Sequence, residues 1–177
     1  MKCNVLIITI DSLRADRCFG IKKTAETPNI DKLIKNGFYF SQVISASDGT
    51  HVSLGSILTG QHPFNHNVTW FKNHSNAKKN FEFLKHEGYT LHATVQDHPF
   101  FETLTSAFDG KDIIRVSTYE RIFEGLGKKI LDRLKLLKTK EPWFYYVHIM
   151  DLHIAKKPPD EYTNNKFASN SWEQNLV

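Results

Sequence analysis

Cysteine is scarce in this chain of 177 residues, and long hydrophobic runs are absent. Two cysteines, Cys3 and Cys18, are too few for a disulfide framework, and Cys3 opens an apolar run in which we expect it to be buried. No segment approaches the roughly 20 consecutive apolar residues that a membrane-spanning helix needs. The first predicted strand begins almost at Met1, which leaves no room for a signal peptide, so we expect a cytoplasmic protein without a membrane segment.

Arginine-rich blocks and interleaved aromatic and basic residues are also missing, so nucleic acid is not an expected partner. The formal net charge of +4 is a mild basic bias, which suits either an anionic substrate or a solvated basic surface. The chain is 40% hydrophobic and 24% charged, which is typical of a globular protein with one sizeable core.

Short apolar runs alternate with helical patterns along the chain. Strands are predicted at residues 3–10, 38–44, 89–95 and 143–149. Helices are predicted from Pro28 to Gly37, at 50–58 and 77–87, and within 119–137, where apolar residues recur at helical spacing. This alternation predicts a layered α/β fold with a mostly parallel sheet between helices.

Polar side chains follow three of the predicted strands. Asp11 follows the first, Gln96 and His98 follow the run at 89–95, and His153 comes after the last, while Thr50 begins a helix. Ligand sites of parallel sheets lie beyond the carboxyl ends of the strands. We therefore expect Asp11, Thr50, His98 and His153 to lie close together.

Local chemistry alone leaves two roles open for Asp11 and for Thr50. Asp11 either caps a turn or is a ligand for a hard or borderline cation. Thr50 either caps the helix that follows it or, at the positive end of that helix, acts as a nucleophile towards an anionic substrate. The two roles of Thr50 are compatible.

Three stretches of the chain resemble the opening of the sulfatases and related enzymes of the alkaline-phosphatase superfamily. They read NVLIITIDSLRADRCFG followed by TPNIDKLIKNGFYFSQV, then GSILTGQHPFNHNV, and finally YYVHIMDLHIAKKPP. The resemblance covers most of residues 4–68 and 142–159 and implies the alkaline-phosphatase-like α/β fold. Because no Asp-His-Gly-type segment for the second half of the metal site is found, residues 1–177 are expected to be the N-terminal part of one sulfatase-like domain, with little turnover alone.

The resemblance also implies a role for each candidate residue. Asp11 and Thr50 would be ligands of a divalent ion, whose identity among Ca, Mg, Mn and Zn stays open. Thr50 would also be the nucleophile. His153 and His98 would bind the anionic oxygens of an ester substrate or protonate its leaving group, and Gln96, in the place of a family lysine, would contribute to substrate binding.

One departure from the family changes the expected chemistry. Residues 50–54, THVSL, stand where sulfatases of the main type carry Cys-x-Pro-Ser-Arg, so Thr50 replaces the cysteine that becomes formylglycine and Leu54 replaces the arginine. Threonine at this place is similar to the phosphoglycerol and phosphoethanolamine transferases, whose threonine attacks phosphorus. We expect a metal-dependent hydrolase or transferase for phosphate or sulfate esters. The alternatives are a sulfatase proper and a degenerate domain without catalysis.

Overall fold

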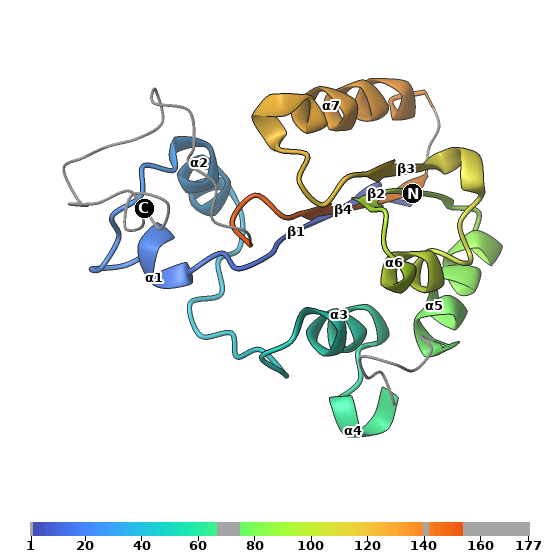
Figure 1. Ribbon diagram of the computed structural model, residues 1–177, viewed down its shortest axis with the longest axis horizontal. Coiled ribbons are helices and arrows are strands. Elements are labelled where there is room, and N and C mark those ends of the chain that lie inside the picture. The colour runs from blue at the N-terminus through green and yellow to red at the C-terminus, as the bar shows by residue number, and fades with distance from the viewer. Residues whose placement is uncertain (1, 67–74, 140–141, 154–177) are drawn as a thin grey trace. The chain divides into compact units, whose positions relative to one another are not determined.

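The computed structural model in Figure 1 describes residues 2–66, 75–139 and 142–153. The chain divides into two compact units, which are described separately below. The first comprises Met1–Asp11 and Ser45–Asp151, and the second comprises Ser12–Ile44 and Leu152–Val177.

The first unit is built on a sheet of four parallel strands. These are β1 (Val5–Ile10), β2 (Thr90–Gln96), β3 (Ile113–Val116) and β4 (Trp143–Ile149), in the order β1-β4-β2-β3. The predicted α/β class with a parallel sheet is confirmed, and β4 has the predicted bounds. The short strand β3 was not predicted from the sequence.

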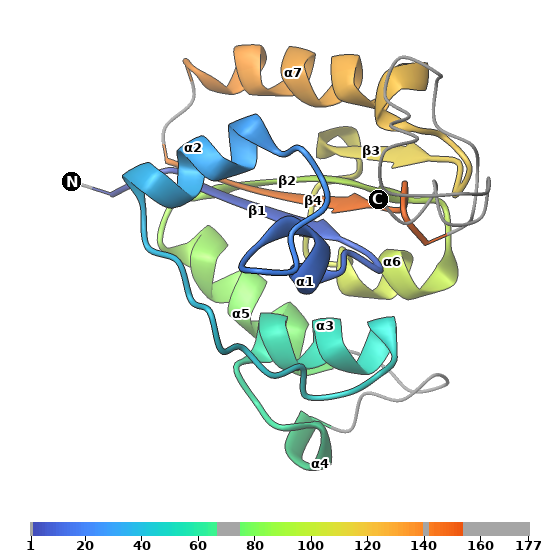
Figure 2. The ribbon, with the colours of Figure 1, turned by 90° about the vertical axis from the view of Figure 1, so that its left-hand side faces the viewer.

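Helices cover both faces of this sheet (Figures 1 and 2). Helix α7 (Leu126–Leu137) lies on one face, and α3 (Thr50–Thr59), α5 (Ser75–His86) and α6 (Pro99–Leu104) lie on the other. The unit also contains α4 (Pro63–His66) and 3-10 turns at Gly110–Asp112 and Ile122–Glu124. Among the helices of the described ranges, none is long and apolar enough to cross a membrane.

Each face of the sheet has its own hydrophobic core. Phe144 and Tyr146 of β4 pack with Leu54, Phe81 and Phe101 from the helices of one face. Tyr145, Val147 and Ile149 of the same strand pack with residues of α7 on the other. Successive side chains of a strand point to opposite faces, so a strand buried on both faces reads as one apolar run. The same alternation directs His148 to the face that carries α3 and α6.

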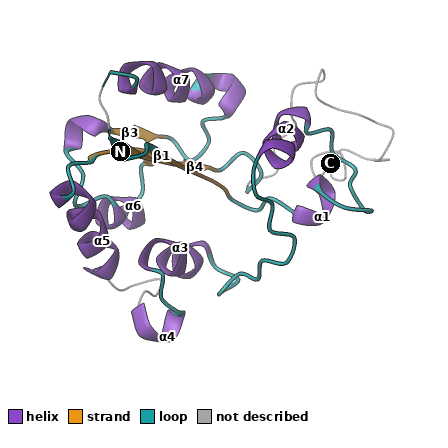
Figure 3. Cartoon of the chain, turned by 180° about the vertical axis from the view of Figure 1, so that it is seen from behind, coloured by secondary structure: helices purple, strands orange, loops and turns teal. Residues whose placement is uncertain are grey.

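One predicted element is wrong, and another is shorter than its pattern. The run at 38–44 forms no strand and is drawn as a loop in Figure 3. A strand needs a hydrogen-bonded neighbour, and within the described ranges this run pairs with none, so Phe38 and Phe40 are exposed despite their alternation. The helical spacing within 119–137 gives a helix only from Leu126, because Gly125 takes a φ of 122° that interrupts it.

The second unit contains α1 (Ala15–Cys18) and α2 (Pro28–Asn36). Pro28 opens α2 and Gly37 follows its end, as predicted. Thr27 does not cap the helix with its side chain, because its hydroxyl donates to Asp31 Oδ1 at 3.1 Å instead. No residue of α2 is buried, and Leu33 on its apolar face is exposed.

The exposure of Cys3 differs from expectation. Cys3 is exposed, whereas Cys18 is buried. Cys3 was expected to be buried because an apolar run follows it, but β1 begins only at Val5, so Cys3 lies outside the strand. Burial also raises the pKa of the Cys18 thiol, so less of its reactive thiolate forms.

An alkylating reagent is therefore expected to modify Cys3 at least about tenfold faster than Cys18 in the folded protein. Peptide mass mapping after timed exposure to iodoacetamide measures both rates. The control is the same reaction in denaturant, where the two thiols should react alike. Equal rates in the folded protein would contradict the burial of Cys18.

Replacing Phe81 by alanine is expected to lower the free energy of unfolding by about 3–5 kcal/mol. Phe81 is 3% exposed, and its ring contacts those of Phe108 and Phe144 at centroid distances of 4.9 and 5.6 Å. Phe83→Ala is the matched control, because Phe83 lies in the same helix but is 63% exposed, and it should cost less than about 1 kcal/mol. Urea unfolding of both variants checks this, and equal losses would contradict the assigned core.

Candidate functional site

The carboxyl ends of β1 and β4 bring the first candidate residues together. Their parallel register pairs Thr9 with His148 and Ile10 with Ile149, and the Asp11 amide extends the pairing by donating to the Ile149 carbonyl at 2.9 Å. The chain then turns, and Ser12 takes a left-handed φ of 61°. Asp11 is thereby fixed at the position directly after β1.

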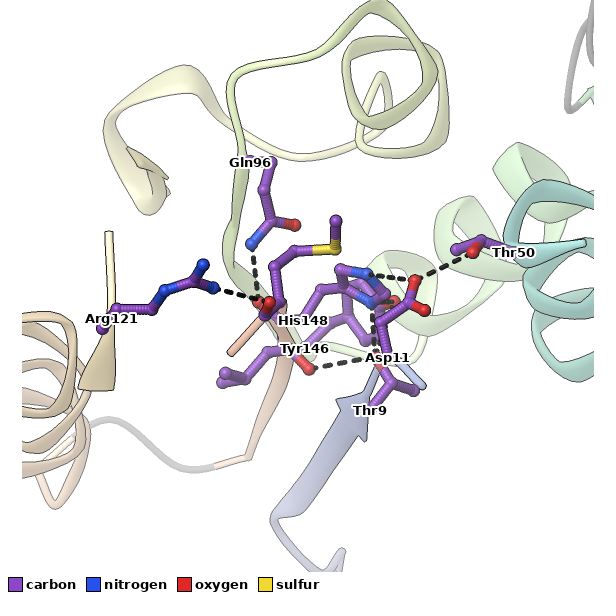
Figure 4. Close-up of polar contacts among 9 residues, drawn as sticks. Thr9, Asp11, Thr50, Gln96, Arg121, Tyr146 and His148 are labelled. Atoms are coloured by element: carbon purple, nitrogen blue, oxygen red, sulfur yellow. Dashed lines mark hydrogen bonds and ion pairs between the residues drawn. The ribbon is translucent and has the colours of Figure 1, made fainter. Parts of the chain in front are cut away.

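Asp11 and Thr50 are in direct contact, although 39 positions separate them (Figure 4). The Thr50 hydroxyl donates to Asp11 Oδ2 at 2.8 Å, and the Asp11 side chain is only 10% exposed. The N-cap of α3 is Gly49, and Thr50 is the first residue of the helix. The interpretation of Thr50 as the N-cap is therefore wrong, because its hydroxyl is used on Asp11.

His148 lies beside the same carboxylate. Its Nε2 atom is 3.5 Å from Asp11 Oδ2, and its Nδ1 atom is 2.7 Å from the Thr9 hydroxyl (Figure 4). The Thr9 hydroxyl is in turn 3.0 Å from the hydroxyl of Tyr146. Burial raises the pKa of Tyr146, so this phenol keeps its proton. Four side chains of the two strands thus form one connected polar group.

A pair of histidines, His51 and His98, comes from α3 and the start of α6. His98 is the N-cap of α6, and its Nδ1 atom accepts from the Phe100 amide at 3.2 Å. The His51 ring stacks on Phe100 with a centroid distance of 4.0 Å and lies 5.6 Å from the His98 ring. Burial, with a smaller contribution from His98, lowers the pKa of His51, so His51 is neutral at pH 7.

Gln96 lies at the end of β2 and is 2% exposed. Its Nε2 atom donates to the His148 carbonyl at 3.0 Å, so it holds the ends of β2 and β4 together (Figure 4). Its Oε1 atom is buried and accepts no hydrogen bond from the described residues. The predicted contribution of Gln96 to substrate binding stays a prediction.

His153 belongs to the second compact unit and is exposed to solvent. Its predicted catalytic role therefore stays a prediction. Of the four residues expected to cluster, the structure places Asp11 and Thr50 in contact, and it places His98 beside His51, the neighbour of Thr50. Val68 and residues 154–159, which belong to the motifs quoted above, lie outside the described residues.

The oxygen donors of Asp11 and Thr50 are of the type that hard divalent ions prefer. They supply two ligands, whereas such ions usually take at least about four. Within the described ranges, no three His, Cys, Asp or Glu side chains are grouped as a metal site. The donor chemistry of Asp11 and Thr50 therefore fits part of a divalent site, and their role as metal ligands stays a prediction.

Sequence reasoning missed Thr9, His51 and Tyr146 and gave His148 no role. Thr9 and Tyr146 lie within apolar strands, where a single hydroxyl gives no signal of a site. Their contacts depend on strand register, which the sequence pattern does not define in a sheet buried on both faces. His148 did have a signal, because it lies in the stretch YYVHIMDLHIAKKPP that carries part of the resemblance.

Comparisons with known proteins agree with the resemblance. The model of the Sulfatase family matches residues 3–176. An arylsulfatase from Clostridium perfringens (strain 13 / Type A) is 35% identical to this chain over 68 residues. That match spans 37% of this chain and 14% of the length of the arylsulfatase. Because the family model covers nearly the whole chain, this protein belongs to the sulfatase family.

Proposed function

We propose that this chain carries the nucleophile half of a metal-dependent hydrolase or transferase that acts on sulfate or phosphate esters, with Thr50 as the nucleophile. The observation that carries the proposal is the 2.8 Å hydrogen bond from the Thr50 hydroxyl to Asp11 at the start of α3. Membership of the sulfatase family supports the ester class.

The position of Thr50 suits attack on an anionic centre. The first turn of α3 presents backbone amides and the positive end of the helix dipole, which favour the negative oxygens of a sulfate or phosphate group. The hydroxyl proton points to Asp11, which leaves the lone pairs of Oγ1 directed away from the carboxylate. Thr50 Oγ1 would form a bond to the sulfur or phosphorus atom of the ester. The bond between that sulfur or phosphorus atom and the leaving oxygen would break at the same time.

The resulting covalent ester of Thr50 would be released by water or by an acceptor alcohol. His98 and His153 are the proposed groups that bind the anionic oxygens or protonate the leaving oxygen. For His98, the hydrogen bond from the Phe100 amide to Nδ1 supports this role, because the neutral ring then carries its proton on Nε2. The exposed ring of His98 leaves it accessible to a substrate.

Asp11 and Thr50 would hold the divalent ion, with further ligands from outside the described residues. Such an ion lowers the pKa of a bound hydroxyl and offsets the charge that gathers on the oxygens of the transferring group. The Asp11 carboxylate is suited to this place because it is mostly buried and fixed by the sheet.

The test is hydrolysis of an aryl sulfate, an aryl phosphate and an aryl phosphodiester by the full-length gene product. We expect turnover of at least one of the three, which a chelator abolishes and added Mn²⁺ or Ca²⁺ restores. Preference for the sulfate would identify a sulfatase, and preference for a phosphate ester would identify the transferase-like chemistry. No turnover of any ester, together with no binding of a divalent ion in a calorimetric titration, would refute the proposal.

A further inference from the structure

His148 is buried at the end of β4 with one ring nitrogen facing Asp11. The residue is 1% exposed, and its Nε2 atom is buried without a hydrogen-bond partner among the described residues. That atom lies 3.5 Å from Asp11 Oδ2, the same oxygen that accepts from Thr50. A buried polar atom without a hydrogen-bond partner lowers the stability of the fold. The position of Nε2 beside the Asp11 carboxylate therefore needs a functional or structural explanation.

The His148 ring is held in this orientation from several sides. Its Nδ1 atom contacts the Thr9 hydroxyl at 2.7 Å, and the strand register places Thr9 directly opposite. The Phe101 ring packs against it at a centroid distance of 4.9 Å. The Tyr146 hydroxyl contacts Thr9 at 3.0 Å and so supports the residue that holds the ring. The ring therefore has little freedom to turn away from Asp11.

The Asp11 carboxylate favours one arrangement of the protons in this group. An ionised carboxylate only accepts hydrogen bonds, so an attraction to Asp11 requires the proton on Nε2. In the neutral ring, Nδ1 then accepts from the Thr9 hydroxyl, and Thr9 accepts from Tyr146. Both His148 and Thr50 thus direct a hydrogen towards Asp11 Oδ2.

We propose that His148, oriented by Thr9, is a positioning residue that holds the Asp11 carboxylate facing Thr50. The proposal rests on the proposed function of Asp11 and Thr50. The Nε2–Oδ2 distance of 3.5 Å exceeds a normal hydrogen bond by about 0.3–0.5 Å but is close enough for electrostatic attraction between the ring N–H and the carboxylate. Groups that orient a metal ligand from behind affect metal affinity and activity without touching the substrate.

Calorimetric titration of the full-length gene product with Mn²⁺ tests this proposal. His148→Phe keeps the volume of the ring and removes both nitrogens, so metal affinity should fall about tenfold to 100-fold. His148→Gln keeps a donor near the position of Nε2 and should recover most of the affinity. Thr9→Val, which has the same shape as threonine, should weaken binding in the same direction even if His148→Phe folds poorly.

His92→Phe is the matched control. His92 is also buried in the sheet, but it contacts Asp112 and Arg133 rather than Asp11. Its replacement should reduce stability and leave metal affinity unchanged. Wild-type affinity in His148→Phe, or an equal loss in His92→Phe, would overturn the proposal.

A double-mutant cycle separates this proposal from the proposed function. The shifts in the urea midpoint for His148→Phe and Asp11→Asn should not add in the double variant, because the two side chains interact. If the wild type binds no divalent ion, the metal role of Asp11 fails, and the cycle alone decides the role of His148. Additive shifts would overturn the positioning role whatever the titration gives.

Discussion

Replacing Thr50 by alanine in the full-length gene product is expected to lower kcat by at least about 10³-fold, because the attacking oxygen is lost. The fold should survive, since the change removes one hydrogen bond to a carboxylate, which costs about 1.5–3 kcal/mol. Thr50→Ser keeps the hydroxyl and should retain part of the activity. Steady-state kinetics with the preferred ester measure both effects.

Ser53→Ala is the matched control for Thr50. Ser53 lies about one turn further along α3, and its hydroxyl donates to the Ser47 carbonyl at 2.8 Å rather than to Asp11. Its hydroxyl cannot replace that of Thr50, and Ser53→Ala should change kcat only a few-fold. Activity of Thr50→Ala near that of the wild type would show that Thr50 is no nucleophile.

Asp11→Asn is expected to weaken binding of a divalent ion and to lower kcat/KM by roughly 100-fold or more. The amide has nearly the shape of the carboxylate but lacks its charge, so the effect on packing should be small. Calorimetric titration and kinetics with the preferred ester measure the two losses. The result also distinguishes a metal ligand from a turn cap, because an asparagine caps a turn as well as an aspartate does.

The control for Asp11 is Asp132→Asn on α7. Asp132 is a half-exposed carboxylate that pairs with Lys128 and Lys135, and its replacement should leave metal affinity and kinetics unchanged. If both substitutions reduced metal affinity and kcat/KM equally, the loss would come from the changed net charge of the protein and not from a metal ligand. Unchanged metal affinity in Asp11→Asn would remove Asp11 from the metal site.

The sequence was sufficient for the elements that are buried on both faces. Trp143–Ile149 is apolar and aromatic apart from His148, and this pattern alone gave β4 its bounds. The helix that begins at Thr50 ends one residue beyond its predicted bound, where Gly60 takes the left-handed φ of 66° that favours glycine. The strand predicted at 38–44 is wrong. Its alternation fits a strand, but a strand also requires a hydrogen-bonded neighbouring strand.

The residues of the candidate site were predictable only where the position of a single residue in the sequence pattern indicated a function. Asp11 and Thr50 could be named because one ends a strand, the other begins a helix, and both match the family pattern. The contacts of Thr9 and Tyr146 with His148 arise from the register between β1 and β4, which no local pattern defines. For the same reason, the sequence left a cap role for Thr50 open, whereas the structure gives that role to Gly49 and directs the Thr50 hydroxyl to Asp11.

The most direct test of Thr50 as the nucleophile is mass spectrometry of the full-length gene product, quenched in acid during turnover of its preferred ester. Peptide mapping should find a sulfate or phosphate group on Thr50, and none in Thr50→Ala. Attachment of the group to another residue, or the same adduct in Thr50→Ala, would contradict the account.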